Sequence, residues 1–397
     1  MKTLYSAAAG LALLFLVTSS RPAAAADLLN SCPPLAPVPS AAGSLGEAVD
    51  TLAALEMRQQ GLPGMTIEIA KRGVPLYARA YGYADLVSCR PARIETPYQI
   101  GSVTKQFTAA AILQLQHAGK LNIDRPVLTY LSGYALDPRI TLRMLLNQTS
   151  GLVDYTTLPP PPGWLNGLPE NTILTDIVAQ PLQFTPGSAY RYSNSNYFIL
   201  GAVIEAVTSL SYWDYLDRHV LRRAGLTHTG PTQSPLAASP YTYDNPAVPG
   251  TTGLAGGLVP DPSIFFSAGG LWSTVADLAK WDAALREGAI ISRRAFQEMV
   301  TPPPSIPEFQ DAAVPTPYAM GWVAESPDAV VPVIWHNGQT LAYTAFNSLR
   351  LENGFSVSVL TNVDIQTHTP LYPFTIALIN AVCASPEGPR VCGEDEP

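Results

Sequence analysis

Strand-like patterns near both ends of this 397-residue chain, with helical patterns between them, limit the folds open to it most strongly. A period-two pattern over 65–83, interrupted by a turn at 71–73, predicts a hairpin. Asn353-Gly354 predicts a second, tight hairpin near the other end. The strands predicted there are 330–336, 342–351 and 355–360. We therefore expect one antiparallel sheet built from two distant segments, with a helical region inserted between them.

Helical periodicity predicts the elements that flank this sheet. The helical ranges are 46–60, 102–118, 140–147, 173–178, 196–208, 212–223, 274–300 and 371–383. Proline and glycine interrupt 159–169 and 233–262, so we expect long loops there, of the kind that line a site. The expected fold class is α+β, an antiparallel sheet flanked by helices, in one catalytic domain. The predicted division of that domain (27–397) is an α/β lobe at 45–118 and 265–385 and a helical lobe at 119–264.

The first 26 residues have the order of a secretory signal. Lys2 precedes an apolar run over 7–17, and alanines occupy 24–26 before Asp27. The run is too short to span a bilayer, and no later stretch is long enough. We therefore expect cleavage after Ala26 and a secreted or periplasmic protein with no stable membrane span. A lipid anchor on Cys32 is disfavoured because that cysteine lies far beyond the apolar run.

The chain is acidic and carries few charges. Its formal net charge is -8 at pH 7, and loss of Lys2 and Arg21 with the signal makes it more negative. This balance argues against nucleic acid as a partner. Charged residues make up 14% of the chain. That fraction is below the roughly 25% of ordinary soluble domains and favours an exported protein.

Four cysteines in an exported chain suggest two disulfides, with three possible pairings. Cys383 and Cys392 are close in sequence, so we favour that pair together with Cys32 and Cys89. A metal site is the alternative, but the chain has no C-x-x-C and its histidines show no H-x-x-x-H spacing. We expect neither a metal nor another cofactor.

A lysine at the start of an apolar helix is the first sign of chemistry. Ser102 and Lys105 lie three residues apart, which places both side chains on one helix face. A mostly apolar run over 107–115 carries Lys105 toward a core. Burial disfavours the charged amine and lets a neutral lysine take the proton of a serine hydroxyl. A solvated lysine on a surface helix capped by a serine is the alternative.

Two later segments complete a set of three motifs. Tyr192 and Asn194 read Y-x-N, and His336 and Gly338 read H-x-G. With S-x-x-K first, the chain resembles the serine penicillin-recognising hydrolases, and specifically the group of class C β-lactamases, D-alanyl-D-alanine carboxypeptidases, D-aminopeptidases and related esterases. The resemblance covers nearly all of 45–382 and extends to the framing segments at 145–152, 267–274 and 318–322.

The resemblance implies a β-lactamase/transpeptidase-like fold and a role for each motif residue. Ser102 attacks a carbonyl carbon and forms an acyl-enzyme that water resolves. Lys105 and Tyr192 share the proton transfers, and the sequence leaves open which of them is the base. Asn194 holds Lys105 and an amide group of the substrate. The backbone amides of Ser102 and Gln339 form the oxyanion hole.

The third motif departs from most class C β-lactamases, which place a lysine where this chain has His336. We expect His336 to offer a substrate carboxylate a weaker cation that depends on pH. Asn337 adds an amide where threonine is usual, and Gly338 permits close backbone approach. These differences favour a carboxypeptidase, aminopeptidase or esterase that acts on a small-molecule, peptide or ester substrate.

Other functions stay open at this point. A non-catalytic penicillin-binding or sensor-like relative and a weak β-lactamase both fit the three motifs. An intact Ser102, Lys105 and Tyr192 argue against the non-catalytic alternative, because binding alone needs no activated nucleophile. An α/β-hydrolase esterase requires a G-x-S-x-G motif, which the chain lacks.

Overall fold

The computed structural model describes residues 29, 31–36, 40–243, 254–303, 317–325, 333–365 and 371–392. The predicted signal at 1–26 and the first residues of the strand predicted at 330–336 lie outside these ranges. Within the described ranges, no helix has both the length and the apolar character needed to cross a membrane.

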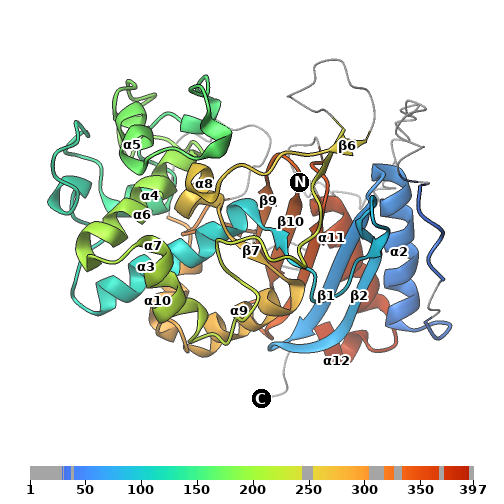
Figure 1. Cartoon of the computed structure of the whole chain (residues 1–397). Coiled ribbons are helices and arrows are strands. Elements are labelled where there is room, and N and C mark those ends of the chain that lie inside the picture. Colours follow the sequence, from blue (N-terminus) through green and yellow to red (C-terminus); the bar gives the residue numbers. More distant parts are fainter. Residues whose placement is uncertain are drawn as a thin grey trace, which may run out of the picture.

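A seven-stranded antiparallel sheet joins the two ends of the chain (Figure 1). Its strand order is β3-β2-β1-β11-β10-β9-β8. The central pair is β1 with β11, in which Met65 lies opposite Thr361 and Lys71 opposite Phe355. The predicted sheet of two distant segments is therefore confirmed. The strands are β1 Gly64–Lys71, β2 Val74–Asp85, β3 Arg90–Pro91, β8 Val323–Ala324, β9 Ile334–Gln339, β10 Thr344–Leu349 and β11 Phe355–Thr361.

Strand β9 extends beyond the strand predicted at 330–336. It pairs with β10 from Ile334 opposite Leu349 to Gln339 opposite Thr344. Asparagine and glycine are poor strand formers, so the hydrophobic pattern ends at His336 while the backbone ladder continues. The third motif therefore lies within a strand and not after one. Strand β10 is shorter at both ends than the predicted 342–351.

Helices cover both faces of the sheet (Figure 1). Helices α2 and α11 pack on each other over one face, and α9 contacts β1 and β11 on the other. Helix α3 contacts α6 and α8, between the sheet and the remaining helices. The helices are α2 Leu45–Gln60, α3 Thr104–His117, α4 Leu142–Leu146, α5 Glu170–Val178, α6 Asn194–Thr208, α7 Tyr212–Leu216, α8 Pro262–Gly269, α9 Val275–Glu287, α10 Arg293–Val300, α11 Tyr372–Ala384 and α12 Gly388–Cys392.

Short helical turns account for several boundaries that differ from prediction. The 3-10 turn η1 Gly101–Val103 precedes α3, so the predicted helix at 102–118 has two parts. The helix predicted at 212–223 is α7 followed by the π-helical turn η5 Asp217–Leu221. Gly288, at φ +84°, ends α9 within the predicted range 274–300. The other 3-10 turns are η2 Val127–Thr129, η3 Tyr155–Thr157 and η4 Trp164–Asn166.

Helix α8 is one of the elements that sequence patterns missed. Pro262 occupies its first turn, where proline is favoured, and Asp261 caps it by accepting from Ser263 N–H at 2.9 Å. The segment 233–262, predicted to lack regular structure, also contains β5 Tyr241–Thr242 paired with β6 Ala255–Gly256. Residues 244–253 within it lie outside the described ranges. A further two-stranded sheet joins β4 Tyr98–Gln99 to β7 Trp272–Ser273.

Both favoured disulfides are present. Cys32 is bonded to Cys89, which ties the segment before α2 to the turn after β2. Cys383 is bonded to Cys392, which ties α11 to α12. Each pairing joins segments near one end of the chain, as expected.

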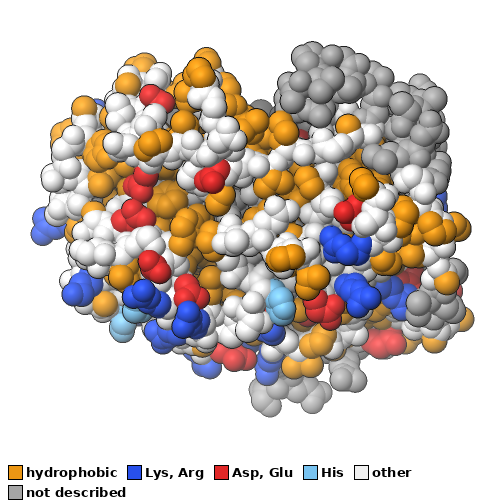
Figure 2. All heavy atoms as spheres, viewed as in Figure 1, with side chains coloured by type: hydrophobic (Ala, Val, Ile, Leu, Met, Phe, Trp, Pro, Cys, Tyr) orange, Lys and Arg blue, Asp and Glu red, His pale blue; other side chains and the backbone are white. Residues whose placement is uncertain are grey.

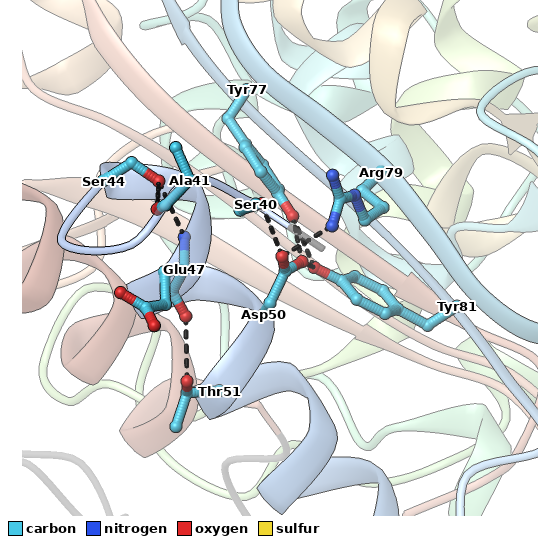
Figure 3. A network of polar contacts seen from close by, with 9 residues as sticks. All are labelled: Ser40, Ala41, Ser44, Glu47, Asp50, Thr51, Tyr77, Arg79 and Tyr81. Carbon is cyan, nitrogen blue, oxygen red and sulfur yellow. Dashed lines mark hydrogen bonds and ion pairs between the residues drawn. The ribbon is translucent and has the colours of Figure 1, made fainter. Parts of the chain in front are cut away.

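A carboxylate on α2 fixes that helix to strand β2 (Figure 3). Asp50 accepts hydrogen bonds from Ser40 Oγ at 2.6 Å, Tyr77 OH at 2.5 Å, Tyr81 OH at 2.9 Å and Arg79 at 2.5 Å. The last three residues alternate along β2 and so share one face of the sheet. Burial alone raises the pKa of Asp50, but these donors outweigh it and hold the pKa below its usual value.

We expect Asp50→Asn to lower the free energy of unfolding by about 1–3 kcal/mol, because an amide cannot accept from all four donors. Urea unfolding followed by circular dichroism measures the change. Glu47→Gln is the matched control, since it removes a charge from the first turn of the same helix. Equal stabilities of the two variants would contradict the assignment.

Candidate active site

Ser102 lies in η1, at the entrance to α3 and against the end of β9. Gly101 has φ +50°, and a β-carbon on it would lie 2.7 Å from Gln339 N. A β-carbon on Gly338 would lie 1.9 Å from Ile100 O. Only glycine allows these backbone approaches. The two glycines therefore bring the turn that carries Ser102 against strand β9.

Lys105 is fully buried one turn along from Ser102, as the apolar run predicted. Its Nζ lies 2.9 Å from Ser102 Oγ, 2.7 Å from Asn194 Oδ1 and 2.7 Å from the Ala268 carbonyl oxygen. Burial lowers the pKa of Lys105 to about 7, although the charge of Asp154 opposes this shift. The amine is therefore partly neutral near neutral pH.

These three contacts suit a neutral amine that accepts from Ser102. The amide oxygen of Asn194 and the carbonyl oxygen of Ala268 only accept hydrogen bonds, so they take the two hydrogens of the amine. In the neutral state the lone pair of Nζ then faces Ser102 Oγ, 2.9 Å away, and can accept the hydroxyl hydrogen. This arrangement is the one that transfer of a proton from serine to lysine requires.

A kink in α8 presents the Ala268 carbonyl. Phe266 has φ 40° and ψ −132°, a backbone conformation that a residue other than glycine rarely adopts. Its ring packs against Phe198 and Tyr212, with centroids 5.1 Å and 5.0 Å away. Aromatic packing thus holds the strained backbone, and the carbonyl two residues later reaches Lys105. Sequence patterns gave no sign of this contact.

Asn194, the first residue of α6, has its amide orientation fixed by two residues that the sequence analysis missed. Its Nδ2 donates to Asp154 Oδ2 at 2.9 Å and lies 3.3 Å from Thr156 Oγ1. Both belong to the turn around η3, directly after the framing segment 145–152. Asp154 also accepts from Thr156 N–H at 3.0 Å, which is an ordinary capping contact in sequence terms. Its contact with Asn194 forms only because α6 packs beside this turn.

Tyr192 approaches Ser102 from the other side. Its hydroxyl lies 2.8 Å from Ser102 Oγ, and Lys105 Nζ lies 4.9 Å from the centroid of its ring. Burial raises the pKa of Tyr192 well above its usual value, and the neighbouring phenol of Tyr318 raises it further. The phenol therefore keeps its proton and donates to Ser102. These surroundings therefore do not favour a phenolate at Tyr192, although Lys105 lies nearby.

His336 does not face the cleft. The structure places its ring behind Tyr192, 2% exposed, with the two ring centroids 6.1 Å apart. Its Nε2 lies 3.0 Å from Tyr318 OH and its Nδ1 lies 2.6 Å from the Asn337 carbonyl oxygen. Burial, aided by the charge of Lys105, lowers the pKa of His336 to about 3. The expected pH-dependent cation for a substrate carboxylate is therefore replaced by a neutral imidazole that supports Tyr318.

The other residues of the third motif lie along β9. Asn337 is half-exposed, and Gly338 faces the Ile100 backbone and not a ligand. Thr340 N–H donates to Tyr343 O across the β9–β10 ladder, so by alternation the N–H of Gln339 points to the opposite edge. Gly101 lies at that edge. The Gln339 amide is therefore directed toward the turn that carries Ser102.

A cleft of about 290 Å³ opens over Ser102. Among its lining residues the charged one is Asp364, which accepts from Gln339 Nε2 at 2.5 Å. The described lining contains no lysine or arginine. The part of the chain that the structure describes also holds no group of three or more His, Cys, Asp or Glu side chains arranged for a metal. The lining residues are Gly101, Ser102, Thr156, Asn194, Phe265, Ala268, Gly269, Gln339, Thr340, Leu341 and Asp364.

Two curated relatives match part of this chain in sequence. The putative penicillin-binding protein PbpX of Bacillus subtilis is 30% identical over 247 residues, which cover 62% of this chain and 60% of that protein. Protein flp of Staphylococcus aureus is 33% identical over 189 residues, 46% of this chain and 38% of that protein. The chain thus spans less than two thirds of the length of either relative.

Solved structures and a family model cover more of the chain. A D-stereospecific amidohydrolase from Streptomyces sp. matches with a TM-score of 0.70 and 25% identity, over 86% of this chain and 98% of that one. An octameric penicillin-binding protein homologue from Pyrococcus abyssi matches with a TM-score of 0.71 and 27% identity, over 85% and 78%. The Beta-lactamase family model matches residues 49–376. The S-x-x-K and Y-x-N motifs meet at Ser102, and the H-x-G motif lies on the adjoining strand β9. The chain belongs to the Beta-lactamase family.

Proposed function

We propose that this protein is a serine hydrolase that cleaves amide or ester bonds through an acyl-enzyme on Ser102. The observation that carries the proposal is the placement of Ser102 Oγ between Lys105 Nζ at 2.9 Å and Tyr192 OH at 2.8 Å. A nucleophile within hydrogen-bond reach of a base, with the base oriented by further groups, is the arrangement that covalent catalysis needs.

The lowered pKa of Lys105 and the raised pKa of Tyr192 separate their roles. Neutral Lys105 accepts the hydroxyl proton as Ser102 Oγ bonds to the substrate carbonyl carbon. The Tyr192 hydroxyl then protonates the departing nitrogen or oxygen and regains a proton from the Lys105 ammonium. The bond to the leaving group breaks, and the acyl group stays on Ser102.

The negative charge on the carbonyl oxygen needs two preorganised donors. We assign the backbone N–H groups of Ser102 and Gln339, because the first belongs to the open first turn of a helix and the second points to the same edge. In deacylation, a water molecule gives its proton to Lys105 as its oxygen attacks the acyl carbon. Cleavage of the carbon–Oγ bond, with return of the proton, restores Ser102.

The charges that line the cleft favour some classes of substrate over others. With His336 neutral and buried, the described lining offers Asp364 as its charged group, and an anion repels a substrate carboxylate. We therefore place amino-acid amides, aminopeptidase substrates and neutral esters before D-alanyl-D-alanine carboxypeptidase substrates and β-lactams. The D-stereospecific amidohydrolase among the similar structures supports substrates of D configuration.

We also propose that the protein acts outside the cytoplasm. Its two disulfides, Cys32–Cys89 and Cys383–Cys392, support an oxidising compartment, because cytosolic thiols are kept reduced. Mass spectrometry of the protein from its native source measures the N-terminus. A mature chain that starts at Asp27 supports export, and a chain that retains Met1 contradicts it.

Matched substrates test the charge preference. We expect D-alanyl-D-alanine amide to be hydrolysed with a kcat/KM about 10-fold or more above that of D-alanyl-D-alanine, because only the second brings a carboxylate toward Asp364. The L,L amide serves as the stereochemical control and should react more slowly. Asp364→Asn keeps the acceptor for Gln339 and should bring the two D substrates within about threefold of each other.

Two outcomes count against this assignment. A preference for the free carboxylate would favour the carboxypeptidase alternative, and an unchanged ratio in Asp364→Asn would remove the role of that residue. Glu287→Gln is the matched control, since Glu287 is an exposed carboxylate on α9 outside the cleft lining. Stable acylation by penicillin without turnover of any amide or ester would favour the binding-protein alternative.

A further inference from the structure

Gln148 holds the main chain on both sides of Tyr192, although the two residues are far apart in the sequence. The amide oxygen of its side chain accepts a hydrogen bond from Ser193 N–H at 3.0 Å. Its backbone carbonyl oxygen accepts from Arg191 N–H, also at 3.0 Å. Because the residues before and after Tyr192 are both tied to Gln148, the direction in which the tyrosine side chain leaves the backbone depends on that glutamine.

Gln148 itself is held firmly in place. It is fully buried and has φ 62°, a left-handed backbone conformation that costs energy in a residue other than glycine. Its Oε1 also accepts from Asn196 Nδ2 at 2.5 Å, and Ser150 Oγ donates to Asn196 Oδ1 at 2.5 Å. Strained backbone persists only where the surrounding contacts fix it, and it is concentrated at functional sites. The side chain of Gln148 therefore offers Ser193 N–H an acceptor in a fixed position.

The side chains of this network, Gln148, Ser150 and Asn196, carry no charge. On the face of the molecule shown in Figure 2, the lysine and arginine side chains gather mainly over the lower part, away from α4 and α6 as Figure 1 places them. Hydrogen bonds between uncharged groups therefore hold the segment of Tyr192. Substitutions among these groups can be made without a change of charge near Lys105.

We propose that Gln148 is a positioning residue for proton donation, which aims the Tyr192 hydroxyl at the leaving group. The proposal rests on the hydrolase function proposed above. The Tyr192 hydroxyl lies 2.8 Å from Ser102 Oγ, and a displacement of about 1 Å in a reacting group can cost about 100-fold in rate. Gln148 does not line the cleft, so it acts on the substrate through Tyr192.

Two acetate esters with different leaving groups test this role. The p-nitrophenolate anion leaves without a proton, whereas the alkoxide of benzyl alcohol needs one as it leaves. Gln148→Met keeps the length of the side chain and removes the acceptor for Ser193 N–H. We expect it to lower kcat/KM by about 30-fold or more on benzyl acetate and by no more than about threefold on p-nitrophenyl acetate. A residue that only supports the fold would lower both values equally.

A double-mutant cycle with Tyr192→Phe shows whether the effect passes through the phenol. In the Tyr192→Phe background, Gln148→Met should change kcat/KM on benzyl acetate by less than about threefold, because no proton donor is left to position. Gln148→Asn repeats the cycle with an amide that is one methylene shorter. Asparagine tolerates the left-handed backbone, so this variant is read if the methionine variant loses the wild-type circular dichroism spectrum.

Ser150→Ala is the matched control, because it removes a buried hydrogen bond from the same network. The Ser150 hydroxyl contacts Asn196 Oδ1 and Leu152 N–H, and not the chain around Tyr192. We expect the ratio of kcat/KM for the two esters to stay within about twofold of wild type in this variant.

The outcomes separate this proposal from the proposed function. Three results overturn the positioning role: equal losses on both esters in the Gln148 variant, an equal loss on benzyl acetate with and without the Tyr192 hydroxyl, or wild-type hydrolysis of the p-nitrophenyl ester alone. In each case, Ser102-dependent hydrolysis of p-nitrophenyl acetate still supports the hydrolase. Absence of hydrolysis of both esters and of labelling at Ser102 overturns the hydrolase, and the role of Gln148 with it.

Discussion

Ser102→Ala is expected to lower kcat/KM by about 10⁴-fold or more on any amide or ester that the protein hydrolyses, because no acyl-enzyme can form without the hydroxyl. The fold should survive, since the side chain loses one oxygen at a partly open site. Steady-state kinetics with p-nitrophenyl acetate measures the loss, and circular dichroism measures the fold.

Ser193 supplies a matched control for this substitution. It follows Tyr192 directly, and its buried hydroxyl has no hydrogen-bond partner among the described residues. Ser193→Ala therefore removes a neighbouring hydroxyl without touching the proposed chemistry. We expect its kcat/KM to stay within about threefold of wild type. Comparable losses in both variants would mean that Ser102 acts through packing and not as the nucleophile.

Lys105→Met is expected to lower kcat/KM by about 10³-fold or more, because it keeps the shape of the buried chain and removes the base. The wild-type profile of kcat/KM on a neutral ester should rise as pH increases through about 7, the pKa of Lys105, since only the neutral amine accepts a proton. The residual activity of the methionine variant should lack this rise. A wild-type profile that is flat between pH 6 and 8 would contradict lysine as the base.

Stability gives an independent check on the same group. Burial lowers the pKa of Lys105 in the folded protein to about 7, against 10.5 for an ordinary lysine. Between these values the unfolded chain binds more protons than the folded one, so folding stability rises with pH through this window. Lys105→Met removes that contribution. The unfolding free energy of wild type minus that of Lys105→Met should therefore increase from about pH 7 to about pH 9.

Most of the sheet and of the helices around it can be predicted from the periodicity of apolar residues and from the turn residues. The alternation of Met65, Ile67 and Ile69 predicts β1, and these three side chains are fully buried there. Asn353-Gly354 predicts the β10–β11 hairpin, in which Gly354 adopts φ +71°. The extension of β9 through His336 to Gln339 depends on pairing with β10, which no local pattern reports. Whether the chain divides into the two predicted lobes stays a prediction.

Some residues of the site can likewise be predicted from local motifs, while others are placed by contacts between distant segments. Ser102, Lys105, Tyr192 and Asn194 could be chosen from short motifs because each motif holds its residues at fixed spacing. The roles of Asp154, the Ala268 carbonyl and the kink at Phe266 depend on contacts with residues 40 or more positions away in the chain, so no local pattern signals them. The burial of His336 also has no local signal. The motif suggested a cation there, but packing lowers the pKa and keeps the imidazole neutral.

The most direct test of the account is the site and pH dependence of labelling by a fluorophosphonate probe. Trypsin should release 94–105, which contains Ser102 and ends at Lys105, and fragmentation of that peptide locates the adduct. We predict a single adduct on Ser102, formed faster as pH rises through about 7, and little labelling of Lys105→Met at any pH. Labelling at another residue, or an equal rate in Lys105→Met, would contradict a serine nucleophile activated by a buried lysine.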